Sequence, residues 1–205
     1  MKLYGHPISG NTHRVRALLG VLGLDYENIT VDLMAGAHKA PDFLAMNPLG
    51  QVPVLVDGDL VLRDSSAILT YLARKYDASN LWLPTDPVAH AHVQAWLSTS
   101  VNEIQHGPFV VRLVKLFGAP LDYDGAMAKT KTLMDDLMEP HLGNREWLVG
   151  DRATIADLAC YSYIARVGEG DFSLEPYPAV RAWLARVEGL DNFPPMAIAA
   201  DLMGG

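Results

Sequence analysis

Two neighbouring features in the stretch NPLGQVPVLVDGDLVLRDSSAILTYL, residues 47–72, could together bind a ligand. The first is Pro53, which opens the apolar run VPVLV. Because proline has no N–H, it is tolerated mainly at the start or the edge of a strand. A cis Val52–Pro53 bond would turn the backbone of Val52 outward, where an extended peptide could pair with it. The alternative is that Pro53 merely begins an edge strand.

The second feature is the polar triplet Asp64, Ser65 and Ser66, which precedes an apolar helical pattern. Asp64 or Ser65 can cap that helix. The N–H groups of Ser65 and Ser66 would then form an anion site, which the helix dipole strengthens. Plain N-capping is the alternative. A free backbone edge and a carboxylate-binding helix start within one short stretch would suit a short acidic peptide.

Two other chemistries are disfavoured. The chain has seven histidines, but His90 and His92 are two residues apart on an expected helix and point to different sides. We therefore expect no metal site. The segment GVLGLD lacks the third glycine of a dinucleotide-binding loop and lies at a helix end.

The elements around these features alternate in the first part of the chain. KLYG and YENITV read as strands, and Val15, Leu18, Leu19 and Leu22 repeat at helical spacing before Gly23. A strand–helix–strand unit favours a parallel pair. APDFLAMN reads as a short helix, and Asp-Gly between VPVLV and LVL predicts a hairpin. With a third helix from Asp64, the predicted order is β-α-β-α-β-β-α.

The second part of the chain reads as all-helical. Residues 77–87, DASNLWLPTDP, resemble a linker. Trp96, Leu97, Val101 and Ile104 suit a long helix, which Pro108 should kink or end. Further helical patterns follow in the segments GAMAKTKTLMDDLMEPHL, TIADLACYSYIARV and YPAVRAWLARVE. We therefore expect an α/β domain over residues 1–78 and a helical domain over residues 87–205.

Composition narrows the class of protein. The chain has 205 residues, and its formal charge of −8 disfavours a nucleic-acid partner. No apolar run reaches the roughly 20 residues of a membrane span, and MKLYGHPISG does not resemble a signal peptide. The only cysteine is Cys160, so no internal disulfide can form. These features favour the cytoplasm and no membrane association.

The sequence resembles the cytosolic glutathione transferases over nearly its whole length. The resemblance is carried by YGHPISGNTHRVR (4–16), AHKAPDFLAMNPLGQVPVL (37–55), DSSAILTYL (64–72) and LVGDRATIADL (148–158). GHPIS and the pattern HK…NP.GQVP are most similar to the phi class of plants and its bacterial relatives. The resemblance implies a thioredoxin-like N-terminal domain, an all-α C-terminal bundle and a role in detoxification.

The resemblance also implies that glutathione is the acidic peptide. Its γ-glutamyl carboxylate would meet Asp64, Ser65 and the helix start, and its cysteinyl backbone would pair with Val52 beside Pro53. His38 and Lys39 would face the glycine carboxylate, with Gln51 nearby. Without the resemblance, His38 and Lys39 would read as a solvated loop.

The family places a Ser, Tyr or Cys after the first strand to stabilise the glutathione thiolate. GHPISGNTH supplies Ser9 where the first helix should begin. A serine hydroxyl can donate to a thiolate, and the helix start adds positive potential. Asn11 and Thr12 are competing donors in the same loop, and a simple N-cap remains the alternative for Ser9. Tyr4 lies within the first strand, which argues against a tyrosine-type enzyme.

Cysteine chemistry is not expected. Cys160 lies in an apolar helix and reads as a small buried hydrophobe, so conjugation is favoured over glutaredoxin-like reduction. Thr154 and Asp157 of TIAD read as a capping box, with a folding role and no chemistry.

The expected function is addition of glutathione to small hydrophobic electrophiles by a homodimeric enzyme. The alternatives are a glutathione-dependent peroxidase, isomerase or dehalogenase, or a non-catalytic regulatory protein with the same fold. The co-substrate site is expected between the Pro7–Ile8 loop and a helix carrying His106, Phe109, Val110 and Leu113.

Overall fold

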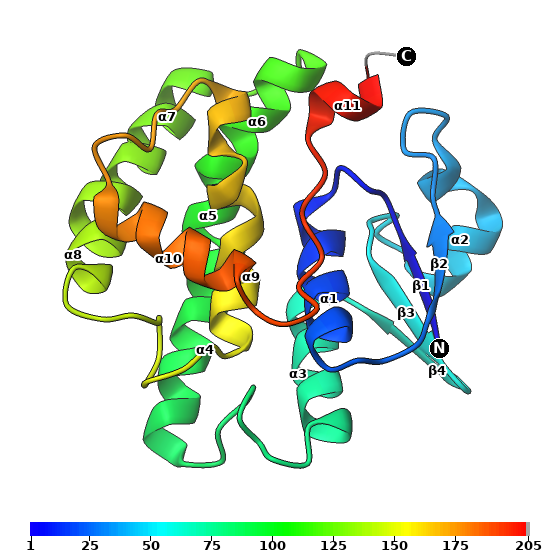
Figure 1. Cartoon of the computed structure of the whole chain (residues 1–205). Coiled ribbons are helices and arrows are strands. Elements are labelled where there is room, and N and C mark those ends of the chain that lie inside the picture. The colour runs from blue at the N-terminus through cyan, green and yellow to red at the C-terminus, as the bar shows by residue number, and fades with distance from the viewer. Residues whose placement is uncertain (204–205) are drawn as a thin grey trace.

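The computed structural model describes residues 1–203 and joins a four-stranded sheet to a bundle of helices (Figure 1). The strands are β1 (Lys2–Gly5), β2 (Glu27–Thr30), β3 (Val54–Asp57) and β4 (Leu60–Arg63). Their order in the sheet is β2-β1-β3-β4. β1 pairs with β2 in parallel, and the other pairs are antiparallel. The predicted parallel unit, the hairpin and the element order are confirmed.

Helices cover both faces of this sheet. α1 (Gly10–Val21) and α3 (Ser65–Tyr76) lie between the sheet and the helical bundle, and α2 (Pro41–Met46) lies on the other face (Figure 1). A 3₁₀ turn, η1 (Ala37–Lys39), precedes α2 in the segment read as a loop from the sequence. The sheet half therefore carries the strand and helix ends from which the sequence predicted a site.

The long helix expected after residue 87 ends earlier than expected. α4 (Pro87–Val101) is followed by the single turn α5 (Glu103–His106) and then by α6 (Pro108–Phe117). The backbone breaks at Asn102 and Gly107, so Pro108 begins a helix rather than ending one. Proline fits the first helical position because its missing N–H would have no partner there.

In a second helical run, a proline lies inside the run and is preceded by a π-helical segment. α7 (Tyr123–Thr132) continues through a π-helical segment, η2 (Leu133–Met138), into α8 (Glu139–Leu142). Pro140 cannot donate to the ordinary helical ladder, and the wider π turn lies directly before it. The remaining elements are α9 (Ile155–Ala165), the 3₁₀ turn η3 (Val167–Gly170), α10 (Pro178–Glu188) and α11 (Ala199–Met203).

α1 packs closely against α9 and joins the two halves. Gly10 leaves space for the ring of Tyr163, since a Cβ at residue 10 would lie 2.6 Å from a ring carbon. The buried imidazole of His13 bonds to Ser162 Oγ at 2.9 Å and to the carbonyl oxygen of Pro194 at 2.9 Å. The C-terminal segment is thereby held across α1, as Figure 1 shows.

The start of α9 forms the predicted capping box. Thr154 Oγ1 accepts from Ala156 N, and Asp157 Oδ2 accepts from Thr154 N at 2.8 Å. Cys160 lies further along the same helix with no exposed surface, and burial raises the pKa of its thiol. Its interpretation as a buried hydrophobe is confirmed. No helix within residues 1–203 combines the length and the apolar character needed to cross a bilayer.

Candidate functional site

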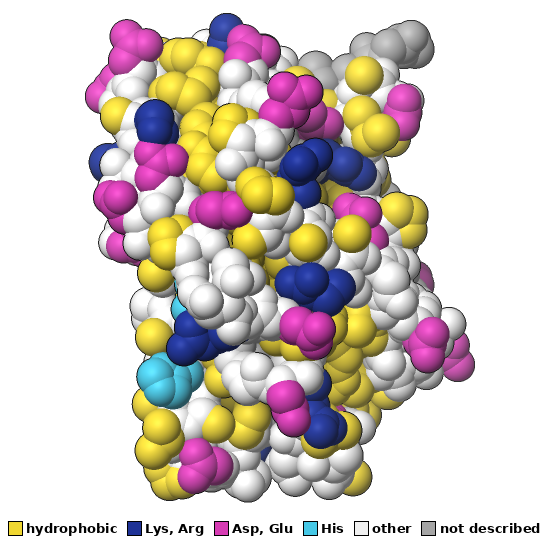
Figure 2. All heavy atoms as spheres, turned by 60° about the vertical axis from the view of Figure 1, so that its left-hand side comes forward, with side chains coloured by type: hydrophobic (Ala, Val, Ile, Leu, Met, Phe, Trp, Pro, Cys, Tyr) yellow, Lys and Arg dark blue, Asp and Glu magenta, His cyan; other side chains and the backbone are white. Residues whose placement is uncertain are grey.

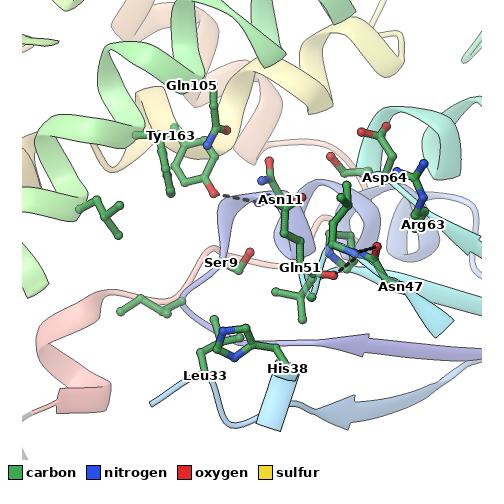
Figure 3. Close-up of a pocket in the computed structure, with 18 of the residues that line it drawn as sticks. Ser9, Asn11, Leu33, His38, Asn47, Gln51, Arg63, Asp64, Gln105 and Tyr163 are labelled. Atoms are coloured by element: carbon green, nitrogen blue, oxygen red, sulfur yellow. Dashed lines mark hydrogen bonds between the residues drawn. The ribbon is translucent and has the colours of Figure 1, made fainter. Parts of the chain in front are cut away.

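A cavity of about 480 Å³ lies between the sheet half and the helical half (Figure 3). Tyr163 and Gln105 reach it from the helices, and Ser9, Gln51 and Asp64 reach it from the sheet half. The residues of the sheet half that line it are Ile8, Ser9, Asn11, Leu33, His38, Asn47, Leu49, Gly50, Gln51, Val52, Pro53, Arg63, Asp64 and Ser65. Most of the predicted site residues therefore share one cavity.

The start of α1 presents Ser9 to this cavity. Ser9 is the N-cap, and its Oγ accepts a hydrogen bond from Thr12 N at 3.2 Å. Its hydroxyl proton is not used in that bond, because an N-cap side chain acts as an acceptor. Ser9 is therefore both a helix cap and a donor available at the cavity, and the two readings of the sequence are compatible.

The two competing donors differ in position. Asn11 lines the cavity, and its backbone N–H donates to the Tyr163 hydroxyl at 3.3 Å (Figure 3). Thr12 is buried, and its Oγ1 accepts from His6 N at 3.3 Å. Thr12 is not among the residues that line the cavity. The structure thus brings Asn11, but not Thr12, to the cavity that Ser9 lines.

The start of α3 forms the other polar end of the cavity. Asp64 caps the helix through Oδ1, which accepts from Ala67 N at 3.0 Å. Its φ of 73° is a conformation that residues with a side chain rarely adopt and that tends to occur at functional sites. Ser65 lies beside it, almost wholly buried.

A buried cation lies behind Ser65. Arg14 has no exposed surface, and its Nη1 donates to Ser65 Oγ at 3.4 Å and to Ser100 Oγ at 3.3 Å. Among the ion pairs formed within residues 1–203, none involves Arg14. Burial lowers the pKa of its guanidinium. An uncompensated positive charge behind the helix start favours an anion in front of it.

The loop before β3 follows the predicted pattern. The Val52–Pro53 peptide is cis, as predicted. Val52 lies outside the strand ladder, which begins at Val54, and lines the cavity with Pro53 and Gln51. Asn47, to which the sequence interpretation gave no role, shapes this loop. Its side chain donates to Gln51 O at 2.7 Å and accepts from Leu49 N at 3.1 Å.

His38 and Lys39 take different positions beside that loop. His38 lines the cavity, whereas Lys39 Nζ donates to Leu49 O at 3.3 Å and to Gly50 O at 3.2 Å. Gly50 has a φ of 58°, and a Cβ there would lie 2.7 Å from Lys39 Nζ. Lys39 is thus a brace for the loop, with one of its three N–H donors left for a ligand.

The apolar wall comes from the helical half and differs in part from the prediction. Ile8, Phe109 and Leu113 line the cavity as expected, but Pro7, His106 and Val110 are not among the lining residues. The wall is instead a stripe at intervals of four residues, formed by Val101, Gln105, Phe109, Leu113 and Phe117. The breaks at Asn102 and Gly107 set which face of the helical run is presented. His106 Nδ1 bonds to the carbonyl oxygen of Asn102 and is exposed.

Two buried residues of this wall were missed from the sequence. Arg112 Nη1 donates to Ile8 O at 3.0 Å, and its Nε is paired with Glu169. It therefore fixes the loop that ends in Ser9. Tyr163 comes from the middle of α9. The four-residue stripe was a signal that could have indicated the wall, but no local signal distinguishes Tyr163 from the buried residues around it.

A second, shallower pocket lies on the helical half and is lined by Lys131, Asp135, Glu139, Pro140, Pro176 and Tyr177. No group of three or more His, Cys, Asp or Glu side chains within residues 1–203 is arranged to hold a metal ion. Figure 2 shows a face on which acidic, basic and apolar side chains are mixed, with apolar ones gathered in its upper part.

Family models identify both halves of the chain. Residues 1–74 match the model described as glutathione S-transferase, N-terminal domain, and residues 122–191 match the one described as glutathione S-transferase, C-terminal domain.

Known proteins agree with these models. The chain is 42% identical over 166 residues to glutathione S-transferase 3 of Zea mays, covering 77% of this chain and 73% of that protein. A crystal structure of a glutathione S-transferase from Xanthobacter autotrophicus superposes with a TM-score of 0.90 at 32% identity, covering 98% of each chain. A glutathione transferase homolog from Drosophila mojavensis with bound glutathione has a TM-score of 0.87 at 27% identity, covering 98% of this chain and 93% of that one.

Proposed function

Because the chain belongs to the glutathione S-transferase family, it is a glutathione transferase, and we propose which residues bind glutathione and activate its thiol. The observation that carries the proposal is the cavity itself. It brings the start of α1, the start of α3 and the loop before β3 to one space. The start of α1 supplies a donor for a thiolate, the start of α3 supplies a site for an anion, and the loop supplies a backbone edge for an extended peptide.

The γ-glutamyl end of glutathione binds at the start of α3. Its carboxylate accepts hydrogen bonds from Ser65 and the first N–H groups of the helix, with the buried charge of Arg14 behind them. Asp64 suits the ammonium group of the same end, since two carboxylates would repel each other. This refines the sequence-based expectation, which gave the carboxylate to Asp64 as well.

The remainder of the tripeptide follows the loop before β3. The cysteinyl backbone pairs with Val52, and the glycine carboxylate lies near His38, Gln51 and the free donor of Lys39. The thiol then reaches Ser9, whose hydroxyl donates to the thiolate. Positive potential at the start of α1 adds to that stabilisation.

The second substrate lies against the stripe from Val101 to Phe117. Phe109, Leu113 and Phe117 make that wall largely apolar, which supports a small hydrophobic electrophile. The thiol first releases its proton to solvent. The thiolate then donates an electron pair to an electron-poor carbon of the electrophile, and the carbon–sulfur bond forms as a π bond to that carbon breaks and its electrons take up a proton. A cytoplasmic location and a role in detoxification are proposals that rest on the family.

Glutathione binding and conjugation test this function. In calorimetry, the protein should bind reduced glutathione, also after treatment with a chelator. Ser65→Ala should weaken binding about tenfold or more, because a hydrogen bond to a charged group contributes about 1.5–3 kcal/mol. A panel of apolar electrophiles and peroxides should show conjugation with at least one electrophile.

The matched control is Ser173→Ala, which removes an exposed serine hydroxyl on the helical half and should leave binding unchanged. Absence of binding at millimolar glutathione would favour the regulatory alternative. If the enzyme turned over peroxides but none of the electrophiles, the assigned reaction would be peroxide reduction rather than conjugation.

We also propose that the enzyme is a homodimer and that its domains span residues 1–78 and 87–205. Large apolar side chains are exposed before β3, on β4 and at the start of α4, namely Leu49, Val61 and Val88. A second copy could cover them. Light scattering at micromolar concentration should give twice the chain mass of 22.4 kDa. A mass of one chain would contradict the dimer.

A further inference from the structure

Gln105 is the polar member of the otherwise apolar stripe that runs from Val101 to Phe117. It comes from the single turn α5, is half-buried and lines the cavity. Figure 3 shows its side chain pointing from the helical half toward the end of the cavity where Ser9 and Asn11 lie. The amide therefore faces the region in which the proposed function brings the two substrates together.

The side chain of Gln105 has no hydrogen-bond partner in the part of the chain that the structure describes. The other polar side chains of α5 are satisfied, because Glu103 accepts from Asn102 Nδ2 at 2.8 Å and His106 Nδ1 bonds to Asn102 O at 2.8 Å. The polar atoms of Gln105 are not among the buried atoms that lack a partner within residues 1–203, so solvent or a ligand can reach them. Two N–H donors thus stand unused at the cavity.

This amide favours one kind of co-substrate over another. A purely hydrocarbon group placed against it displaces its water without replacing the hydrogen bond, which weakens binding. A co-substrate with an acceptor oxygen replaces that bond. In a carbonyl compound conjugated to a carbon–carbon double bond, the oxygen lies at one end of the conjugated system and the electron-poor carbon at the other. Such a molecule can span the cavity from the helical wall that carries Gln105 to the start of α1, where Ser9 lies.

We propose that Gln105 is a catalytic residue that donates a hydrogen bond to the carbonyl oxygen of a conjugated enone or enal. The inference rests on the proposed conjugation reaction. The thiolate bonds to the electron-poor end of the double bond, the π electrons of that bond shift to the carbonyl oxygen, and an enolate forms. The carbon next to the carbonyl then takes a proton from solvent, and the carbonyl bond forms again. The N–H of Gln105 stabilises the negative charge on the oxygen while it develops.

Gln105→Met tests the inference, because methionine keeps the length of the side chain and removes both N–H donors. The probes are an aryl-substituted enone and a benzyl halide, which has no oxygen near its reacting carbon. A donor binds a charged oxygen more strongly than a neutral one, so the loss should appear mainly in kcat. With the enone, kcat should fall about tenfold, while KM changes less than about twofold. With the benzyl halide, kcat/KM should stay within about twofold of the native value.

Gln94→Met is the matched control. It removes the same amide from α4, where Gln94 is exposed and does not line the cavity, so both rates should stay native. If Gln94→Met slows the enone reaction as much as Gln105→Met, or if Gln105→Met slows both electrophiles equally, the effect is structural and the inference is overturned. An enone-selective loss in Asn11→Ala without one in Gln105→Met would assign the oxygen to Asn11 and also overturn it.

The thiol pKa and the native substrate range separate this inference from the proposed function. Gln105→Met should leave the pKa of the bound thiol unmoved, because the amide acts on the electrophile. A rise like that expected for Ser9→Ala would place Gln105 at the sulfur and overturn its role at the oxygen. If the native enzyme conjugates the benzyl halide but not the enone, the proposed function stands and the inference fails. If it binds glutathione but conjugates neither probe nor any other electrophile, the proposed conjugation fails, and the inference fails with it.

Discussion

Replacing Ser9 with alanine is expected to raise the pKa of the bound glutathione thiol by about one to two units. A hydrogen bond to a charged group contributes about 1.5–3 kcal/mol, and one pKa unit corresponds to about 1.4 kcal/mol. A free thiol has a pKa of about 8.5, so raising the pKa of the bound thiol toward that value removes most of the thiolate at neutral pH. The kcat/KM near pH 6.5 should therefore fall about 10- to 100-fold, and the two enzymes should converge at alkaline pH.

The neighbouring donors provide the controls for this result. Asn11→Ala and Thr12→Val should leave the thiol pKa close to that of the native enzyme. For Thr12 the structure gives a reason, since its side chain is buried and accepts from His6 N. A shift in Asn11→Ala without one in Ser9→Ala would assign the thiolate to Asn11. If none of the three variants shifts the pKa, backbone donors at the start of α1 carry the activation.

Replacing Asp157 with alanine should have the largest effect on stability, about 3–5 kcal/mol of unfolding free energy. Asp157 Oδ1 accepts from Leu148 N at 3.0 Å and from Trp183 Nε1 at 2.9 Å. Oδ2 accepts from Thr154 N at 2.8 Å and from Thr154 Oγ1 at 3.3 Å. All of these bonds are buried, and each donor left without a partner costs about 1–3 kcal/mol, with incomplete additivity.

Urea unfolding measures this loss. Asp157→Asn should lose less unfolding free energy than Asp157→Ala, because one acceptor oxygen remains. It should still lose some, because its NH₂ group would face N–H and O–H donors. Asp151→Ala is the control, since Asp151 is exposed in the preceding turn and should change stability by less than about 0.5 kcal/mol. Similar unfolding curves for Asp157→Ala and Asp151→Ala would show that the capping box is not what holds the helical half together.

Features encoded by adjacent residues could be predicted from the sequence. The β3–β4 hairpin follows from Asp57 and Gly58, which has a φ of 61°, and the capping box follows from Thr154 and Asp157. Each of these signals depends on chemistry within a few residues, so the fold class and the helix starts that line the cavity could be inferred.

Features that depend on packing could not be predicted. His106 and Val110 were expected at the cavity, but the wall follows every fourth residue through Gln105, Phe109 and Leu113, and the backbone breaks at Asn102 and Gly107 could not be read from the sequence. The bond between Asn11 N and the Tyr163 hydroxyl joins residues 152 positions apart. No local pattern in the chain indicates that pair, since Tyr163 reads simply as a member of a buried helix.

The contact between α1 and α9 also constrains how this chain can change over time. Gly10 fits one particular ring, and His13 bonds to Ser162 and to the C-terminal segment at Pro194. The two halves are therefore not independent modules that recombination at the linker could exchange freely. A hybrid inherits a matched surface only when both parents carry glycine opposite a large ring and a polar partner opposite the imidazole. Substitutions on these two helices are consequently expected to be retained in pairs across lineages.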